Sequence, residues 1–463
     1  MDKIQIAIIL GISIYVLVMI IIGLWANKFI KTPVDYIIAG RRLSFPLSLG
    51  TIFATWFGAE TVLGASSTAN KEGILGVIAD PFGAGLCLII SGIFLVPAFY
   101  KLKITTNIDY FERRYNKHVG FIMTLIYLPP YIGWIGAQML AFGTIFSHFT
   151  ALPIKLAIII SAIIVVFYTY MGGLLADAIT DFIQMFFILL SLVVIFIIIL
   201  INHNNEISSI PKDMYSFFPK STTSKDWLLY LESWIIIGLG SLGGQDLVAR
   251  ILAAKNQNIA RSSSILAGFL YWILGLIPIL LGIWAAVILP NNTGDAVILE
   301  LAIKFLPLPL IILFAGGILS AIMSTVDTAL LAPASLIGEN LFPYFKKNAT
   351  DKEKLFWCRI SVIILGFFSL LLALKFTSIY ELCLESWTFL LTSFTAPLLF
   401  SLFWKKTTSY GVIAGAILGF ISWVILNFLF PTQPIKLFAF LISCLSVFIT
   451  SLITYKNLDA ETK

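Results

Sequence analysis

The sequence predicts an all-α integral membrane protein with about 13 transmembrane helices. Hydrophobic residues make up 59% of the 463 residues and charged residues only 12%, whereas a soluble domain carries about a quarter charged residues. Apolar runs of about 20 residues recur along the chain, and such a run crosses the roughly 30 Å hydrocarbon core as a helix. The clearest is FIQMFFILLSLVVIFIIILI at 182–201, which carries no charged residue. We therefore predict one polytopic membrane domain over residues 1–463.

The apolar runs place the spans in chain order, and every connection between them is too short for a soluble domain. The first span, at 4–27, is too long for the hydrophobic region of a signal peptide, and no small-residue cleavage site is evident. We therefore interpret residues 4–28 as a retained helix. The other spans are predicted at about 45–70, 76–100, 119–148, 152–170, 175–202, 227–244, 262–290, 305–337, 356–374, 378–404, 409–430 and 435–455.

Basic residues predict the orientation of these spans, because cytoplasmic loops are enriched in Lys and Arg. With the N-terminus outside, all arginines and most lysines fall in cytoplasmic connections, and the C-terminus is cytoplasmic. The compact loops favour a bacterial inner membrane. The net charge of +6 arises in short loops between spans and does not indicate nucleic-acid binding. We expect a small-molecule solute and the lipid bilayer as partners, and no obligatory protein partner.

Residues of the kinds that build catalytic or metal centres are scattered along the chain. The cysteines lack CxxC spacing and are interpreted as small core residues, namely Cys87, Cys358, Cys383 and Cys444. The histidines lie at loop edges without metal-site or catalytic-triad spacing, at His118, His148 and His203. We expect no catalytic residue and no enzyme. A sensory or receptor membrane protein is the alternative from another class, but no output domain follows the last span in this sequence.

Two spans are interrupted by glycines and polar residues. The second contains FATWFGAETVLG at 53–64, and the seventh ends in IGLGSLGGQDLVAR at 237–250. Unwound backbone leaves polar groups unpaired in lipid, so it survives only where protein or a cavity encloses it. The two spans are five apart, the spacing expected of inverted repeats that each open with a discontinuous helix. Close helix packing through small residues is the alternative.

Hydroxyl side chains in the ninth span suggest a cation site. Within GGILSAIMSTVDTALLAPAS at 316–335, Ala321, Ser324 and Thr325 lie on one helical turn. The hydroxyls of Ser324 and Thr325 and the Ala321 carbonyl supply oxygen ligands, and carbonyls at the first break, of Ala54 and Phe57, supply two more. Such a set suits Na⁺. Alternatively, these hydroxyls bond only to neighbouring backbone, as Ser and Thr in membrane helices commonly do.

Glu60 is a carboxylate inside the second span, which makes it a functional candidate. It either neutralises a substrate amine or bonds to the free amides of the broken helix as a structural clamp. Further acidic residues lie at or near membrane depth, namely Asp80, Asp246, Asp327 and Glu385. Because Asp327 follows the hydroxyls of the ninth span, we expect it to close the cytoplasmic side through a polar network.

Several stretches resemble the sodium:solute symporter family, whose members include proline, sugar, pantothenate and choline transporters. The resemblance covers nearly the whole chain. The stretches are DYIIAGRRLS at 35–44, FGAETVLGAS in the broken helix, YTYMGGLLADAITDFIQ at 168–184, QDLVARILAAKN at 245–256 and SAIMSTVDTALLAPAS at 320–335. The YTYMGG element with its TDxxQ continuation, and the A-x-x-S-T pattern of the ninth span, are specific to the family.

The resemblance implies a leucine-transporter-like core of two inverted five-helix repeats, at 45–202 and 227–404. The extra helix 4–28 precedes the repeats and two extra helices at 409–455 follow them. It also implies one Na⁺ site, formed by the carbonyls of Ala54, Phe57 and Ala321 and the hydroxyls of Ser324 and Thr325. The family pattern places Asp181 near the inner exit path of this co-transported ion. Alternatively, Asp181 only caps the start of the sixth span.

The resemblance is greatest to the high-affinity choline transporter branch, to which NATDKEKLFWCRISV at 348–362 is also similar. That branch holds choline in an aromatic cage, because ring faces attract a quaternary ammonium. Trp56 and Trp134 match cage positions, whereas the other two fall on Ala84 and Gly244, which carry no ring. The polar pocket candidates are Thr61, Glu60, Gln138 and Gln245.

The resemblance implies a Na⁺-coupled secondary active symporter that imports a small organic solute by alternating access. The solute expected is a small organic cation or zwitterion, such as choline or betaine. An amino acid such as proline, or a small carboxylate such as pantothenate, is the alternative.

Overall fold

A computed structural model describes residues 30–290 and 294–461, together with residues 9–11, 13, 14, 17, 18, 21, 22, 25 and 28. Within this part of the chain every regular element is helical, and one isolated bridge joins Leu43 to Ala254. The predicted first span, at 4–27, falls largely outside the described residues. The all-α prediction is confirmed for the rest.

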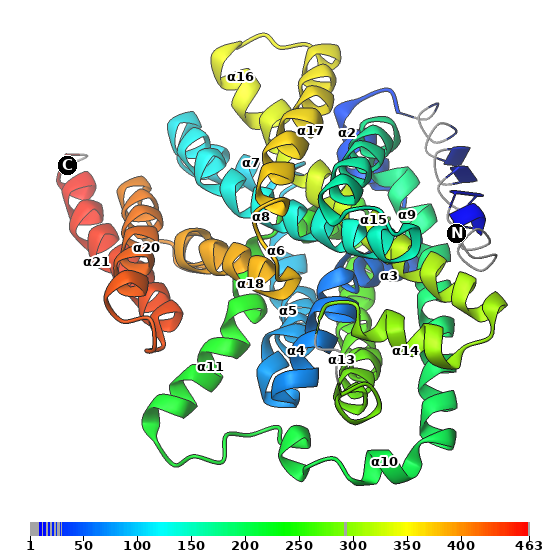
Figure 1. Cartoon of the computed structure of the whole chain (residues 1–463). Helices are drawn as coiled ribbons and strands as arrows, with labels where there is room; N and C mark the ends of the chain where they lie inside the picture. Colours follow the sequence, from blue (N-terminus) through cyan, green and yellow to red (C-terminus); the bar gives the residue numbers. More distant parts are fainter. Residues whose placement is uncertain are drawn as a thin grey trace.

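The helices are arranged around a central group, with one pair set apart at the side (Figure 1). Those of the first half are α2 (Pro33–Ile38), α3 (Phe45–Trp56), α4 (Ala65–Glu72), α5 (Ala84–Ile90), α6 (Val96–Tyr100), α7 (Asn107–Arg114), α8 (Lys117–Thr150), α9 (Ile154–Asn202) and α10 (Asn204–Ser208). Those of the second half are α11 (Ser224–Gly238), α12 (Gln245–Ala253), α13 (Gln257–Ile288), α14 (Val297–Phe305), α15 (Leu308–Leu336), α16 (Phe342–Phe345), α17 (Asp351–Ala373), α18 (Ile379–Leu390), α19 (Ala396–Phe403), α20 (Ser409–Leu429) and α21 (Ile435–Glu461).

Nine helical segments of the described chain are long and apolar enough to cross a membrane. They are Ile74–Tyr100, Lys117–Thr150, Asp177–Asn202, Gln257–Ile288, Leu308–Phe345, Asp351–Ala373, Ile379–Phe403, Ser409–Leu429 and Ile435–Tyr455. A further span is bent by 55° between Ser224–Gly243 and Gln245–Ala253, and Phe45–Trp56 and Ile154–Tyr170 are shorter apolar helices. Each predicted span from 45 onward therefore has a helical counterpart. The number thirteen and the repeat architecture stay predictions.

Local sequence signals set several helix starts. A capping box forms at Thr32, Thr106 and Thr350. In each box the threonine hydroxyl accepts a hydrogen bond from the backbone N–H of the third helical residue, and the carboxylate of that residue accepts one from the backbone N–H of the threonine. Asn116 and Asn256 cap α8 and α13 through their side-chain oxygens. These caps fix the first residues of the short helices α2 and α7 and of the long helices α8, α13 and α17.

The centre of the fold is built by helices from both halves of the chain. α15 packs against α9 and α8, while α13 packs against α3, α4 and α5. α20 and α21 pack mainly on each other, at the left of Figure 1. Glycine allows the close approach of α13 to α4, because a Cβ on Gly282 would lie 2.1 Å from the Ser66 carbonyl oxygen. The broken helix α3 packs between α9, α13 and α15.

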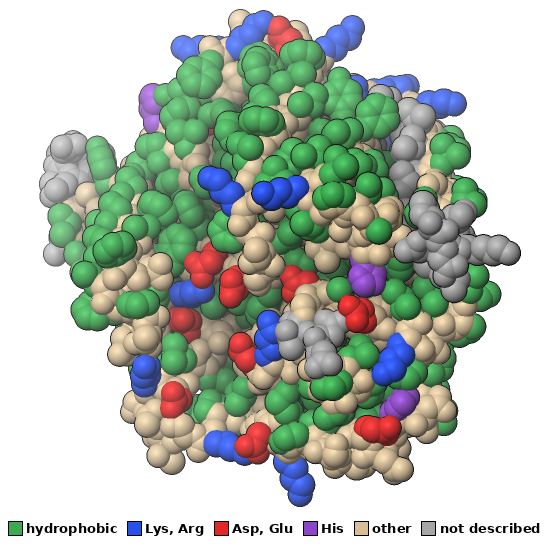
Figure 2. Space-filling model, in the orientation of Figure 1, with side chains coloured by type: hydrophobic (Ala, Val, Ile, Leu, Met, Phe, Trp, Pro, Cys, Tyr) green, Lys and Arg blue, Asp and Glu red, His purple; other side chains and the backbone are tan. Residues whose placement is uncertain are grey.

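The outer surface is rich in hydrophobic side chains, as expected of a membrane protein. In Figure 2 these side chains cover broad areas of the visible face, and Lys and Arg gather along its top edge. Large exposed apolar residues occur along α9, α17 and α20, among them Ile163, Phe367 and Phe428. A surface of this kind is stable against lipid tails and would be an aggregation hazard in water.

Candidate functional site

The first break lies between Trp56, where α3 ends, and Glu60, where helical backbone resumes as a π-helical turn over Glu60–Gly64. Gly58 N–H donates to the Trp56 carbonyl at 2.9 Å. In a continuous α-helix this N–H would donate to the carbonyl of Ala54, four residues earlier. The break therefore releases the Ala54 carbonyl from its helical donor, as the predicted ion site requires.

The break touches the hydroxyl-bearing turn of α15. A Cβ built on Gly58 would lie 2.3 Å from Thr325 Oγ1, so the two residues are in direct contact. Thr325 Oγ1 donates to the Ala321 carbonyl at 3.0 Å. This is the local backbone bond that the sequence left open as an alternative, and it places the Thr325 oxygen beside the Ala321 oxygen. The structure thus brings the predicted Na⁺ ligands of α3 and α15 to one interface.

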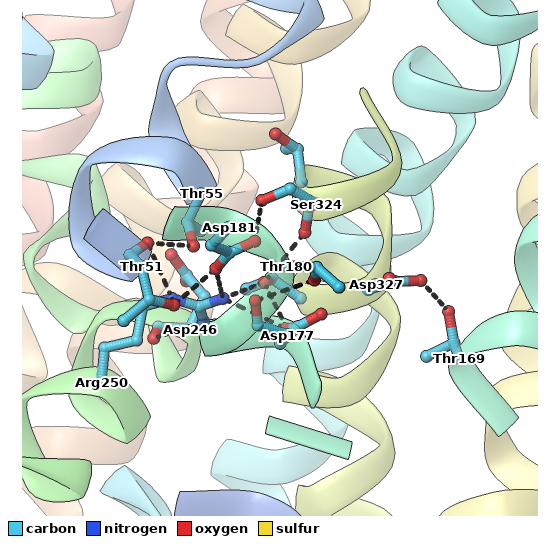
Figure 3. A network of polar contacts seen from close by, with 12 residues as sticks. Thr51, Thr55, Thr169, Asp177, Thr180, Asp181, Asp246, Arg250, Ser324 and Asp327 are labelled. Carbon is cyan, nitrogen blue, oxygen red and sulfur yellow. Dashed lines mark hydrogen bonds and ion pairs between the residues drawn. The ribbon is translucent and has the colours of Figure 1, made fainter. Parts of the chain in front are cut away.

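A buried polar network continues from this interface toward α9 and α12 (Figure 3). Asp181 accepts hydrogen bonds from the hydroxyls of Thr51 and Ser324. The predicted ion-path residue therefore contacts a predicted Na⁺ ligand directly. Ser324 belongs both to the turn of the predicted ion site and to this network, so one hydroxyl connects Asp181 to that turn.

Arg250 on α12 is the cation of this network and is only 1% exposed. Its Nη2 lies 3.3 Å from Asp177 Oδ2 and 3.5 Å from Asp181 Oδ2. Its Nε donates to the hydroxyl and the carbonyl of Thr51, at 3.0 and 3.2 Å. Sequence reasoning missed Arg250 and Asp177 as members of the site. The available signal was an arginine at membrane depth one helical turn after Asp246.

Asp327 lies at the far end of the same network. It accepts a hydrogen bond from Thr169 on α9 at 2.5 Å, whereas Thr328 next to it donates to Asp177 at 3.1 Å. The expected polar network around Asp327 is present and joins α15 to α9. By contrast, Glu385 is part-exposed and pairs with Lys436 at 2.8 Å, so it lies apart from the site.

The second break separates α11 from α12. A short turn over Gly240–Gly243 follows α11, and Gly244 leaves the helical region (ψ 123°) before Gln245 begins α12. The Gln245 side chain is engaged by the 105–107 loop: its Oε1 accepts from Asn107 N–H at 2.8 Å and its Nε2 donates to the Thr105 carbonyl at 3.3 Å. The structure therefore places this predicted pocket residue away from Glu60 and Trp134.

Trp56 and Trp134 come together with two aromatic residues that the sequence did not single out. The Trp387 ring on α18 lies 4.8 Å from that of Trp134 and 6.2 Å from that of Trp56, between centroids. The Tyr131 ring lies 5.7 Å from Trp134 and 6.3 Å from Trp387. We call Trp56, Tyr131, Trp134 and Trp387 the aromatic box.

Neither Ala84 nor Gly244 contributes a ring to the aromatic box. A Cβ on Gly244 would lie 2.6 Å from Asp246 Oδ1 and 3.0 Å from the Ser241 carbonyl, so a larger side chain would need the backbone to move. Trp387 and Tyr131 instead reach Trp134 from α18 and from within α8. One sequence signal could have indicated Trp387: it lies well inside a span, whereas tryptophans of membrane proteins concentrate at the interfaces.

Two carboxylates accept hydrogen bonds from two of the three indole N–H groups of the aromatic box, those of Trp56 and Trp134. Trp134 Nε1 donates to Glu60 Oε2 at 2.8 Å, and Gln138 Nε2 donates to the same oxygen at 3.4 Å. Trp56 Nε1 donates to Asp246 Oδ2 at 3.0 Å, and the Tyr131 hydroxyl donates to Asp246 Oδ1. Glu60 therefore connects the break to side chains of α8, and its role in binding a solute stays a prediction.

Thr61 faces a third carboxylate, Asp80. The Thr61 hydroxyl donates to Asp80 Oδ2 at 2.7 Å, and the Tyr271 hydroxyl lies 3.0 Å from Asp80 Oδ1. Tyr271 also donates to the Trp56 carbonyl at the break. Thr61 is thus linked to the break through Tyr271, on the α13 side of α3. Of the predicted substrate residues, Trp56, Glu60, Trp134 and Gln138 lie together, Thr61 is adjacent, and Gln245 lies apart.

Comparison with protein families identifies one that spans most of the chain: the model of the "Sodium:solute symporter family" matches residues 36–419. Among curated proteins, high-affinity choline transporter 1 of Torpedo marmorata is 29% identical over 89% of this chain and 75% of its own length. The high affinity choline transporter 1 of Homo sapiens is 26% identical with the same coverage. The high-affinity proline transporter PutP of Bacillus subtilis is 27% identical over 96% of this chain and 98% of its own.

Solved structures support the same arrangement of helices. A Na⁺-coupled sialic acid symporter in a substrate-bound outward-open state matches with a TM-score of 0.82 and 20% identity, over 98% of both chains. The nucleobase-cation-symport-1 family transporter Mhp1, in a closed conformation, matches with a TM-score of 0.61 and 17% identity, over 93% of this chain and 95% of its own. At such identities these two likenesses show the fold.

Proposed function

Because the chain belongs to the sodium:solute symporter family, we propose that it imports a small organic solute with Na⁺ by alternating access. The contact between the first helix break and the hydroxyl-bearing turn of α15 carries this proposal, because it joins the two elements that would share the ion. Ala54 and Phe57 would supply carbonyls from α3. Ala321, Ser324 and Thr325 would supply one carbonyl and two hydroxyls from α15.

The positions of these ligands explain how Na⁺ binding would be coupled to solute binding. An ion held by both α3 and α15 stabilises the conformation in which they touch, and its loss allows them to part. The solute site lies on the next residues of the same break, since Trp56 precedes Phe57 and Glu60 follows it. Ion and solute therefore stabilise one another's binding conformation. Entry of one Na⁺ also contributes about 2.3 kcal/mol per 100 mV of membrane potential.

The polar network gives the ion a route to the inner side. Ser324 already contacts Asp181, and Asp181 leads to Asp177 and Arg250. The carboxylate of Asp181 beside the site would attract Na⁺ away from the neutral oxygen ligands. The guanidinium of Arg250 would weaken the binding of Na⁺ to Asp181 and Asp177, so that the ion is released. We place this route on the cytoplasmic side of a bacterial inner membrane, with the N-terminus outside and the C-terminus inside.

The aromatic box favours a small organic cation or zwitterion as the solute, such as choline or betaine. Ring faces attract cations by about 2 kcal/mol or more when desolvated, and Glu60 adds negative charge beside them. Similarity to choline transporters over most of the chain supports this assignment. An amino acid such as proline is the alternative, which similarity to two Bacillus subtilis proline transporters supports. Pantothenate or another small carboxylate is less compatible with the three carboxylates.

Uptake into proteoliposomes tests the proposal. Purified protein is reconstituted, and accumulation of choline, betaine, proline and pantothenate is followed under an inward Na⁺ gradient with a negative interior. We expect saturable uptake of at least one solute that disappears when K⁺ replaces Na⁺. Equal uptake in Na⁺ and K⁺ would refute Na⁺ coupling.

A further inference from the structure

We propose that the solute carries a protonated amine with at least one N–H group, bound beside Glu60 and donating to Gln138 Oε1, together with an oxygen that Trp387 recognises. A small amino alcohol has this chemistry, and a fully methylated quaternary ammonium is the poorer ligand. This inference rests on the proposed function, because it takes the aromatic box as the solute site.

The first observation is an unused acceptor beside Glu60. Gln138 is fully buried, its Nε2 donates to Glu60 Oε2 at 3.4 Å, and its Oε1 has no hydrogen-bond partner among the described residues. The two atoms belong to one amide group, so Oε1 lies close to the Glu60 carboxylate. Turning the amide around would bring its oxygen against the carboxylate, where the two acceptors would repel. The Glu60 carboxylate and Gln138 Oε1 thus form a buried pair of acceptors, and Gln138 Oε1 is the member of the pair that lacks a donor.

A donor from the solute resolves this deficiency. A buried polar group without a hydrogen bond destabilises the protein, and an ammonium N–H can satisfy Gln138 Oε1 while its charge faces Glu60. A quaternary ammonium has methyl groups in place of every N–H. It keeps its attraction to the ring faces but leaves Gln138 Oε1 without a donor. The rings therefore bind amines with an N–H group and quaternary ammonium compounds alike, and the acceptor pair distinguishes between them.

The second observation is the charge around the aromatic box. Glu60, Asp80 and Asp246 are each at most 5% exposed. Within the described parts of the chain, none of the three forms an ion pair with Lys or Arg, since Arg250 pairs with Asp177 and Asp181. A buried carboxylate is unfavourable in its charged form without a cation beside it, and a cationic solute supplies that cation. A carboxylate on the solute would add to the deficit, which disfavours betaine and proline.

The third observation is an unused donor on Trp387. Its Nε1 is buried and has no hydrogen-bond partner in the described structure, although the indoles of Trp56 and Trp134 each bond to a carboxylate. A hydroxyl or ether oxygen on the solute would accept from it. In addition to the rings of the aromatic box, the solute therefore meets the acceptors of Glu60 and Gln138 and the donor Trp387 Nε1. This set matches an amine and an oxygen on one small molecule.

A methylation series tests the inference on the unmodified protein. Binding of ethanolamine, its N-methyl and N,N-dimethyl derivatives, and choline is measured by calorimetry in Na⁺ buffer. All four carry one positive charge and one hydroxyl, and only the number of N–H groups changes. We expect Kd to rise along the series and to be at least tenfold higher for choline than for the dimethyl compound.

Variants assign the effect to the acceptor pair. Gln138→Met keeps the length of the side chain and removes the acceptor, so we expect the step between the dimethyl compound and choline to shrink below threefold. Gln433→Met changes an exposed glutamine that is not part of the aromatic box and should leave the series unchanged. The melting temperature of each variant shows that it is folded, and the series on the unmodified protein needs no variant.

The outcomes separate this inference from the proposed function. Choline binding as tightly as the dimethyl compound overturns the inference, and the symporter proposal stands if uptake depends on Na⁺. Na⁺-dependent uptake of proline or pantothenate with no binding of the series also overturns only the inference. Absence of Na⁺-dependent uptake for every solute overturns the proposed function itself.

Discussion

Gly58 and Thr325 meet where the broken helix α3 contacts α15, with a glycine Cα against a threonine hydroxyl. A Cβ at Gly58 would lie 2.3 Å from Thr325 Oγ1 and 3.1 Å from Thr325 Cβ. Glycine is required here for the approach of α15 more than for backbone freedom, since Gly58 is absent from the positions with positive φ. The contact links the proposed Na⁺ site to the helix that carries the solute site.

Gly58→Ala tests this contact. The new methyl group would push Thr325 away from the break, so we expect the Na⁺ concentration for half-maximal uptake to rise at least tenfold. Overpacking of a buried site typically also costs about 1–3 kcal/mol of stability, which a lower melting temperature would report.

Gly316→Ala on the same helix α15 is the matched control, because a Cβ there meets no atom within 4 Å. It should leave Na⁺ dependence unchanged. If the Gly58 variant behaved like this control, the approach of α15 to the break would not matter for the ion.

Removing the two α15 hydroxyls tests the ion site itself. In Ser324→Ala with Thr325→Ala we expect Na⁺ stimulation of uptake to be lost, because two of five oxygen ligands disappear. Uptake is compared at increasing Na⁺ concentration with the same solute. Ser335→Ala serves as control, since Ser335 is buried on the same helix and bonds only to the Ala332 carbonyl in the described structure. Retained Na⁺ stimulation in the double variant would place the ion elsewhere.

Replacing Arg250 tests the charge balance of the network. Arg250→Met leaves Asp177 and Asp181 buried without their cation, and breaking a buried ion pair from one side costs about 3–5 kcal/mol. We therefore expect a large fall in melting temperature in detergent. Adding Asp177→Asn and Asp181→Asn removes the orphaned charges and should restore part of the loss.

Arg261→Met is the control for Arg250, because Arg261 is exposed near the start of α13. It should change the melting temperature little. A failure of the Asp-to-Asn changes to recover any stability in the Arg250 variant would show that packing, rather than charge, dominates there.

Trp387→Ala tests the aromatic box. Loss of one buried ring face from a cation site removes about 2 kcal/mol, so we expect Kd for the solute to rise roughly tenfold or more. Trp387→Phe keeps a ring and should recover most of the affinity for a quaternary ammonium. Trp227→Ala changes an exposed tryptophan of α11 outside the box and is the control. Unchanged solute binding in Trp387→Ala would exclude α18 from the solute site.

The sequence by itself determined the class of the protein, the positions of the spans from residue 45 onward, and the place of each helix break. These features are local: an apolar run of about 20 residues spans the membrane wherever it packs, and glycines interrupt a helix at their own position. The resemblance also fixed the positions of the predicted Na⁺ ligands, because its motifs are short and contiguous. Trp56 and Trp134 were predicted as pocket residues for the same reason, whereas Glu60 was predicted because it is a carboxylate inside a span.

Only the tertiary structure decided which distant residues share a site. Trp387 reaches Trp56 across more than 300 residues of chain, Arg250 on α12 meets Asp177 and Asp181 on α9, and Gln245 turns to the 105–107 loop. Hydrophobic patterning shows which residues are in a span, but the register and rotation of one helix against another depend on how their side chains interlock. For the same reason, only the tertiary structure shows that Gln138 Oε1 and Trp387 Nε1 lack hydrogen-bond partners among the described residues, because this depends on the positions of all surrounding side chains.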